Sequence, residues 1–174
     1  ASPVSVDYAT ADGTAEHGFD YEGTSGTLFF EPGDPLTQTV TVVLLGDTIV
    51  EDDETFTVTL SNPLYGEEED DSRVDVDAEA AVGIGTIVND DAALLQIDNQ
   101  TVTEGDAGQT TMTFTVTVDL EVAGGFTVAF NVADVTATAG SDYAVTTLSP
   151  LVFDGLANET QTIQVTVNGD LLVE

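Results

Sequence analysis

Apolar and polar residues alternate along most of the chain in short runs, which is the pattern of half-buried β-strands. The runs are rich in Val, Thr, Ile and Phe, which fit a pleated surface, and no stretch combines a helical period with capping residues. The predicted strands are residues 4–8, 26–30, 37–45, 55–60, 81–88, 94–98, 110–118, 126–132, 148–153 and 161–167. Turn-forming residues at 31–34 and 61–63 separate several of them. The pattern predicts an all-β sandwich with Greek-key character.

The chain also resembles itself at a spacing of about one domain. Four segments recur: residues 6–12 as 128–134, 18–21 as 140–143, 39–42 as 162–165, and 46–47 as 169–170. The first two pairs are offset by 122 positions and the last two by 123, so one inserted residue explains the difference. A repeat of this length indicates two copies of one domain type, out of phase with the chain ends.

The expected domain boundary lies at residues 88–92, where one predicted strand passes into the next apolar run with almost no linker. We expect residues 1–91 to form a domain that lacks its opening strands, and residues 92–174 a domain that lacks its closing strands. Each would expose sheet edges that its missing strands would cover. The expected partners are therefore neighbouring copies of the same chain, in a head-to-tail array or a homopolymeric fibre.

The charge of the chain is extreme. Its 174 residues include 33 acidic and one basic residue, for a formal net charge of −32, yet 41% of the residues are hydrophobic. That apolar content predicts a folded protein rather than an acidic disordered tail. Self-repulsion opposes compaction unless a bound divalent cation or dissolved salt neutralises it. Arg73 is the one permanently positive side chain, so nucleic acid is disfavoured as a partner. No apolar run approaches the length of a membrane span.

Catalytic constellations are sparse. The chain has no cysteine and a single histidine, His17, which excludes a thiolate or histidine zinc site and a nucleophile–histidine triad. Paired carboxylates carry no information in a chain with so many acids, and no aromatic-rich cleft for a sugar is evident. We therefore expect a non-enzymatic protein.

A family resemblance rests on several motifs taken together. They are residues 4–15 with 18–21, residues 25–33, residues 46–56 with 60–63, residues 85–91, and residues 102–108. These segments resemble the Calx-β domain. The resemblance implies a seven-stranded, immunoglobulin-like Greek-key β-sandwich in tandem. Some members, notably in sodium–calcium exchangers, bind several calcium ions at one end, whereas others are structural modules of adhesins and large surface proteins.

The resemblance also implies a set of calcium ligands. Calcium takes six to eight oxygen ligands, and acidic residues occupy the family's ligand positions in loops that the fold would gather at one end. In the first domain they are Asp20, Asp47, Glu51, Glu54, Asp90 and Asp91, and in the second Glu104, Asp142, Asp170 and Glu174. The two sets are complementary, so a complete site is expected where the array continues. The alternative is a solvated acidic surface typical of salt-adapted proteins, which is our interpretation of the run at residues 67–71.

These observations predict a calcium-binding structural repeat of an extracellular fibre, adhesin or matrix protein, located outside the cell or on its surface. Calcium would rigidify the domain ends and junctions. The alternative is a calcium-sensing regulatory module of a larger protein. An enzyme accessory domain is a third possibility.

Overall fold

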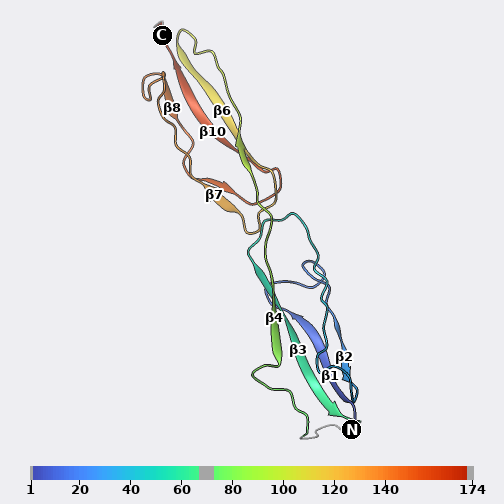
Figure 1. Ribbon diagram of the computed structural model, residues 1–174. Coiled ribbons are helices and arrows are strands. Elements are labelled where there is room, and N and C mark those ends of the chain that lie inside the picture. Colours follow the sequence, from blue (N-terminus) through green and yellow to red (C-terminus); the bar gives the residue numbers. More distant parts are fainter. Residues whose placement is uncertain (1, 67–72, 172–174) are drawn as a thin grey trace. The chain divides into compact units, whose positions relative to one another are not determined.

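The structure, a computed structural model, describes residues 2–66 and 73–171. The chain forms two compact units (Figure 1). Unit 1 comprises Ala1–Asp47 and Asp52–Asn89, and unit 2 comprises Thr48–Glu51 and Asp90–Glu174. Every regular element in the described residues is a β-strand, which confirms the predicted all-β fold class. A search of the same residues finds no helix with the length and apolarity needed to cross a membrane.

Unit 1 is built on one antiparallel sheet of order β2-β1-β3-β4. Its strands are β1 (Val4–Asp12), β2 (Ser25–Phe30), β3 (Glu54–Tyr65) and β4 (Val82–Ile87). The core is small: Ala15, Tyr21 and Phe56 are buried, and the Tyr21 and Phe56 rings stack with their centroids 4.6 Å apart. The long loop between β1 and β2 supplies Tyr21, so the core itself fixes the path of that loop.

Residues 61–63, predicted as a turn, lie inside β3. The pairing of β3 with β1 shifts register between Ser5 and Asp7, which is a β-bulge. Asn62 adopts a positive φ of 49° there, and its side-chain amide donates a hydrogen bond of 3.0 Å to the Asp7 carboxylate. A bulge can hold a proline without loss of a ladder hydrogen bond, so Pro63 does not end the strand.

Unit 2 contains two antiparallel sheets. The larger has the order β5-β6-β10-β8, formed by β5 (Leu95–Ile97), β6 (Gly108–Val118), β10 (Thr160–Gly169) and β8 (Tyr143–Val145). The smaller pairs β7 (Phe126–Val128) with β9 (Leu151–Phe153). The buried core residues are Val116, Val118, Leu151, Phe153, Ile163 and Val165. They alternate with exposed residues along β9 and the central part of β10, as expected for strands with one buried face.

Residues 37–45, predicted as a strand, form only one isolated bridge in the structure, between Leu44 and Tyr21. The corresponding segment of unit 2 is the strand β10, which pairs with β6 over ten residues. In the described part of unit 1 no strand occupies the position of β6. A β-strand depends on a neighbour for its hydrogen bonds, so the same local sequence is a strand in one unit and irregular in the other.

The predicted division into residues 1–91 and 92–174, each an incomplete domain, stays a prediction. The segment Thr48–Glu51 groups with unit 2. Its Val50 amide donates to the Glu121 carbonyl, and the Val50 carbonyl accepts from the Ala123 amide, each at 2.9 Å.

Candidate metal centre

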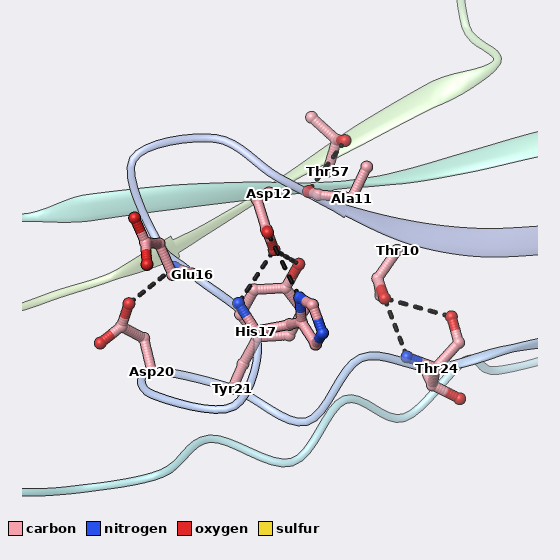
Figure 2. A network of polar contacts seen from close by, with 9 residues as sticks. All are labelled: Thr10, Ala11, Asp12, Glu16, His17, Asp20, Tyr21, Thr24 and Thr57. Atoms are coloured by element: carbon pink, nitrogen blue, oxygen red, sulfur yellow. Dashed lines mark hydrogen bonds and ion pairs between the residues drawn. The ribbon is translucent and has the colours of Figure 1, made fainter.

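The loop that carries Asp20 is fastened at Asp12, the last residue of β1 (Figure 2). One carboxylate oxygen of Asp12 accepts hydrogen bonds from the Tyr21 hydroxyl at 2.6 Å and from the His17 backbone amide at 2.9 Å. The second oxygen lies 3.3 Å from the His17 Nδ1. Thr10 and Thr24 close the far side of the loop, where the Thr24 amide donates to the Thr10 hydroxyl at 2.8 Å. The loop is therefore held at both ends by side chains of its own sheet.

Asp20 sits in a tight turn inside this loop. The Asp20 Oδ2 accepts the Glu16 amide at 2.7 Å, and the Asp20 amide donates to the Glu16 carbonyl at 3.0 Å (Figure 2). Gly18 has a φ of +88°, a conformation that side chains rarely adopt, and its amide donates to the Tyr21 carbonyl at 2.8 Å. These contacts fix Asp20 in place, and its other carboxylate oxygen is not used by them.

Unit 2 repeats this arrangement residue by residue, at the offset of 122. Asp134 accepts the Tyr143 hydroxyl at 2.6 Å and the Ala139 amide at 2.9 Å. Asp142 accepts the Thr138 amide at 2.7 Å, as Asp20 accepts that of Glu16. We call the contact of Asp12 with Tyr21, and that of Asp134 with Tyr143, the Asp–Tyr lock.

Sequence reasoning did not assign Asp12 and Asp134 a role. The signal was present, because the repeat aligns these two aspartates with each other and their tyrosines nine positions further on.

Hydrogen bonding shifts the pKa of these groups. The Tyr21 hydroxyl, followed by the His17 amide, holds the pKa of Asp12 below its usual value, and the Thr138 amide does the same for Asp142. Burial and the nearby Asp12 carboxylate raise the pKa of Tyr21. In unit 2 the Asp134 carboxylate is the main cause of the raised pKa of Tyr143. The Asp12 and Asp142 carboxylates are therefore charged, and the Tyr21 and Tyr143 hydroxyls neutral, over the physiological range.

Within unit 1 the structure brings Asp20 and Asp47 together, with one carboxylate oxygen from each within 4.8 Å of the other. The Leu45 amide donates to the Asp20 carbonyl at 2.9 Å, two residues before Asp47, which places the two loops side by side. Asp20 is half-buried and Asp47 is exposed. At this separation two carboxylates repel by about 1 kcal/mol in bulk water and by about 3.5 kcal/mol at an effective dielectric near 20. A cation between them would remove that repulsion.

The other predicted ligands of the first set are carried by other segments of the chain. Glu54 is half-buried at the start of β3, where it pairs with Ile87 of β4. Glu51 is half-buried in the segment Thr48–Glu51. Asp90 is exposed and Asp91 half-buried, and both precede β5 in unit 2.

In unit 2 the second predicted set meets around the end of β10. The Asn168 amide donates to the Asp142 carbonyl at 2.8 Å, and a Cβ on Gly169 would lie 3.0 Å from the Glu104 carbonyl oxygen. The backbones of Glu104, Asp142 and Asp170 therefore converge. Among the described residues, however, their carboxylates do not form a group of three with oxygens within 4.8 Å of one another. Glu174 lies outside the described residues.

The donor chemistry fits a hard cation. The predicted aspartate and glutamate ligands supply carboxylate oxygens, which calcium and magnesium prefer, and the chain has no cysteine to supply a thiolate. Flexible loops with several oxygens suit calcium better than magnesium, which demands near-octahedral geometry.

Comparison with known proteins identifies the family. The Calx-beta domain profile matches residues 1–86 and again residues 88–174. The chain belongs to the Calx-beta domain family and contains two copies of that domain. The resemblance inferred from the sequence, including its immunoglobulin-like sandwich, is confirmed.

Among curated proteins, the chain is similar to sodium/calcium exchanger 1 of Rattus norvegicus, with 49% identity over 59 residues. It is also similar to sodium/calcium exchanger 3 of Homo sapiens, with 45% identity over 64 residues. These matches cover 34% and 37% of the chain, but only 6% and 7% of the exchangers. The chain therefore spans a small part of these relatives' length.

Two solved structures are also similar. The apo-form Calx CBD1 domain shares 32% identity at a TM-score of 0.43, covering 52% of this chain and 72% of that one. The calcium binding domain CBD12 of CALX1.1 shares 25% identity at a TM-score of 0.44, covering 98% of this chain and 65% of that one.

The predicted extracellular or cell-surface location is wrong. The curated relatives that the chain matches are sodium/calcium exchangers, not extracellular fibre or adhesin proteins. The prediction relied on the surface proteins that contain the same domain, and the acidic composition did not distinguish the two settings. The comparisons also give no support to a fibre of repeated copies or to an adhesin.

Proposed function

We propose that this chain is a non-enzymatic calcium-binding regulatory module of a larger protein. The observation that carries the proposal is the pairing of Asp20 with Asp47, whose carboxylate oxygens lie within 4.8 Å in loops held by the sheet of unit 1. Family membership supports it.

The ligand set we propose begins with these two aspartates. Glu54 follows Asp47 in the sequence of the same unit and would add further carboxylate oxygens. One carboxylate oxygen of Asp20 accepts a hydrogen bond from the Glu16 amide, so Asp20 would coordinate the ion through its other oxygen. Calcium would then replace a repulsive contact by an attractive one and join two loops that meet at a few backbone bonds.

A regulatory role is proposed because a bound ion would change the order of the loops. Binding to loops rather than to the core alters the order of the loops while the sheet stays intact. The calcium-stiffened fibre, predicted first from the sequence, has no support among the relatives. The sensing role, given there as the alternative, takes its place.

Titration calorimetry of the intact chain with calcium tests the site. Asp47→Asn should weaken calcium binding by about tenfold or more, because it removes one charged ligand. Asp34→Asn is the matched control: it removes the same charge from an exposed turn of unit 1 and should leave the affinity unchanged. Equal effects of the two substitutions would indicate diffuse screening by the acidic surface, and the proposal would fail.

The regulatory part has a separate readout. Hydrogen exchange at residues 13–24 and 46–53 should slow when calcium is added, whereas exchange within β1 and β3 should not change. If calcium binds tightly but hydrogen exchange in these loops does not change, the ion has a structural role and the sensing role is overturned.

A further inference from the structure

An open groove with a volume of about 550 Å³ lies beside β1 in unit 1. It is lined by residues 9–12 of β1, by His17 and Tyr21 of the loop that follows, and by residues 23–25, where β2 begins. Pockets that bind small molecules have volumes of about 300–1,000 Å³, so the groove is large enough for a ligand of that kind.

Hydrogen bonds among these same residues frame the groove (Figure 2). At one end the Thr24 amide donates to the Thr10 hydroxyl at 2.8 Å, and the Thr10 amide donates to the Thr24 carbonyl at 2.9 Å. At the other end the His17 amide donates to the Asp12 carboxylate at 2.9 Å. The groove is therefore a property of β1 and the loop that is fastened to it.

The repeat in unit 2 shows which lining residues the fold does not require. At the offset of 122 the Asp–Tyr lock is kept, but Val145 stands in place of Gly23 and Ala139 in place of His17. Gly23 is not one of the glycines with a positive φ, and a Cβ there would lie 3.5 Å from the His17 Cβ, which is an ordinary contact. A side chain would thus be accepted at Gly23, and its absence leaves the groove open.

Asp12 and His17 supply the hydrogen-bonding groups of the groove. Their side chains are 43% and 69% exposed, so a ligand can reach both of them. An ionised carboxylate can only accept hydrogen bonds, so the His17 Nδ1, 3.3 Å from the Asp12 Oδ2, carries the proton of the ring. The Nε2 of the neutral ring is then an acceptor as well.

The charge and the remaining walls narrow the choice of ligand. An anion is disfavoured, because the chain has a formal net charge of −32. Ala9, Ala11 and Gly23 line the groove with small apolar groups. A strand rises by about 3.3 Å per residue, so residues 9–12 extend over about 10 Å, which is the length of a short alkyl chain.

We propose that this groove binds a primary alkylammonium group. The ammonium group would donate hydrogen bonds to the Asp12 carboxylate and to the His17 Nε2. The methylene chain attached to it would lie against Ala9, Ala11 and Gly23. The ligand thus matches the groove in charge, in its hydrogen-bond donors and in its apolar part.

Titration of the intact chain with 1,5-diaminopentane tests the groove, at fixed pH and ionic strength and with calcium in excess to occupy carboxylates elsewhere. His17 is the single histidine of the chain, so its carbon-bound ring protons give one assignable pair of NMR signals. These signals should shift saturably, with half-saturation at about 1 mM or below. Tetramethylammonium, a cation without an N–H donor, should not reproduce the shift.

Charge-neutral substitutions separate the groove from the general attraction of cations to an acidic surface. Gly23→Val introduces the residue of unit 2 and should weaken binding by about tenfold or more. Thr41→Val, an exposed change elsewhere in unit 1, should leave the affinity unaltered. His17→Ala, followed by calorimetry, should weaken binding too, and it provides the test if Gly23→Val disturbs the circular dichroism spectrum.

A lysine side chain carries the same chemical group as a free amine. Capped lysine, acetylated at its α-amine and amidated at its carboxyl, is therefore titrated in parallel. Tighter binding of diaminopentane would assign the groove to a free amine, and tighter binding of the capped lysine to a lysine side chain. Absence of a saturable shift up to about 10 mM of either compound would overturn the proposal. An equal shift with tetramethylammonium, or an unchanged affinity in folded Gly23→Val and His17→Ala, would overturn it as well.

Discussion

Phe153 offers a test of whether the two units depend on separate cores. It is 1% exposed at the end of β9, and its ring is stacked on Phe126 with centroids 4.9 Å apart and planes 1° from parallel. Phe153→Ala removes the largest apolar side chain from the buried cluster of unit 2. The buried cluster of unit 1 contains other residues, namely Ala15, Tyr21 and Phe56.

The expected cost follows from the environment of the ring. Burial of a phenylalanine side chain stabilises by about 1.5–3 kcal/mol, and a stacked aromatic pair adds about 0.5–1.5 kcal/mol. The cavity left behind adds a further penalty, which brings the expected destabilisation to about 3–5 kcal/mol. A domain of this size has a total stability of about 5–15 kcal/mol, so the loss should be plain in a denaturation curve.

Urea denaturation followed by circular dichroism measures the loss, and hydrogen exchange assigns it to a unit. Val152→Ala is the matched control: its side chain lies on the same strand, is 60% exposed, and should cost no more than about 0.5 kcal/mol. Amides of β6 and β10 should lose protection in Phe153→Ala while those of β1 and β3 keep it. Equal costs for the two substitutions, or loss of protection in both units, would refute the reasoning.

Two further predictions concern acid and a glycine. The pKa of Asp142 is held below its usual value in the folded chain, chiefly by the Thr138 amide, so the stability it contributes is present above the unfolded-state pKa of about 3.9 and is lost as the pH falls through the folded-state pKa. Melting temperatures of Asp142→Asn and the parent chain, measured from pH 7 to pH 2, should differ at neutral pH and converge in acid; a constant difference would contradict this. Gly155 has a φ of +92°, and a Cβ there would collide with the Val122 carbonyl oxygen, whereas Gly33, at +102°, has no atom within 4 Å of the Cβ position. In thermal unfolding, Gly155→Ala should therefore cost about 1–3 kcal/mol more than Gly33→Ala, and equal costs would show that backbone strain alone decides.

Alternation of apolar and polar residues located most strands, because each sheet has one buried face to which that period corresponds. This alternation failed to predict the structure where a neighbouring strand decides whether a segment is extended. Residues 37–45 carry the strand pattern of β10 but lack, among the described residues, the partner that β6 provides in unit 2. Residues 61–63 look like a turn but continue β3, because a bulge beside Asp7 absorbs Asn62 and Pro63. β8, at Tyr143–Val145, is too short for any periodicity to reveal.

The candidate site was predictable to a similar degree. Asp20 and Asp142 were recognised as a repeated pair, and the structure gives them the same turn and equivalent amide partners, Glu16 and Thr138. The contact of Asp20 with Asp47 depends on two loops far apart in the sequence, so the family pattern, not local spacing, pointed to it. The role of Asp12 was missed although the repeat aligns it with Asp134, because its hydrogen bond with the Tyr21 hydroxyl forms only when the loop folds back on the strand.

The Asp–Tyr lock gives each domain an internal spectroscopic reporter. A phenolic proton that donates to a carboxylate at an oxygen–oxygen distance of 2.6 Å is in a short, charge-assisted hydrogen bond and should resonate downfield of ordinary hydroxyl protons in a proton NMR spectrum. The two locks differ in one neighbour, since an imidazole approaches Asp12 and an alanine stands at that position beside Asp134. Their signals should therefore be resolved from each other. The integrity of either loop can then be followed in the unlabelled protein, one domain at a time, as ligands, acid or partner chains are added.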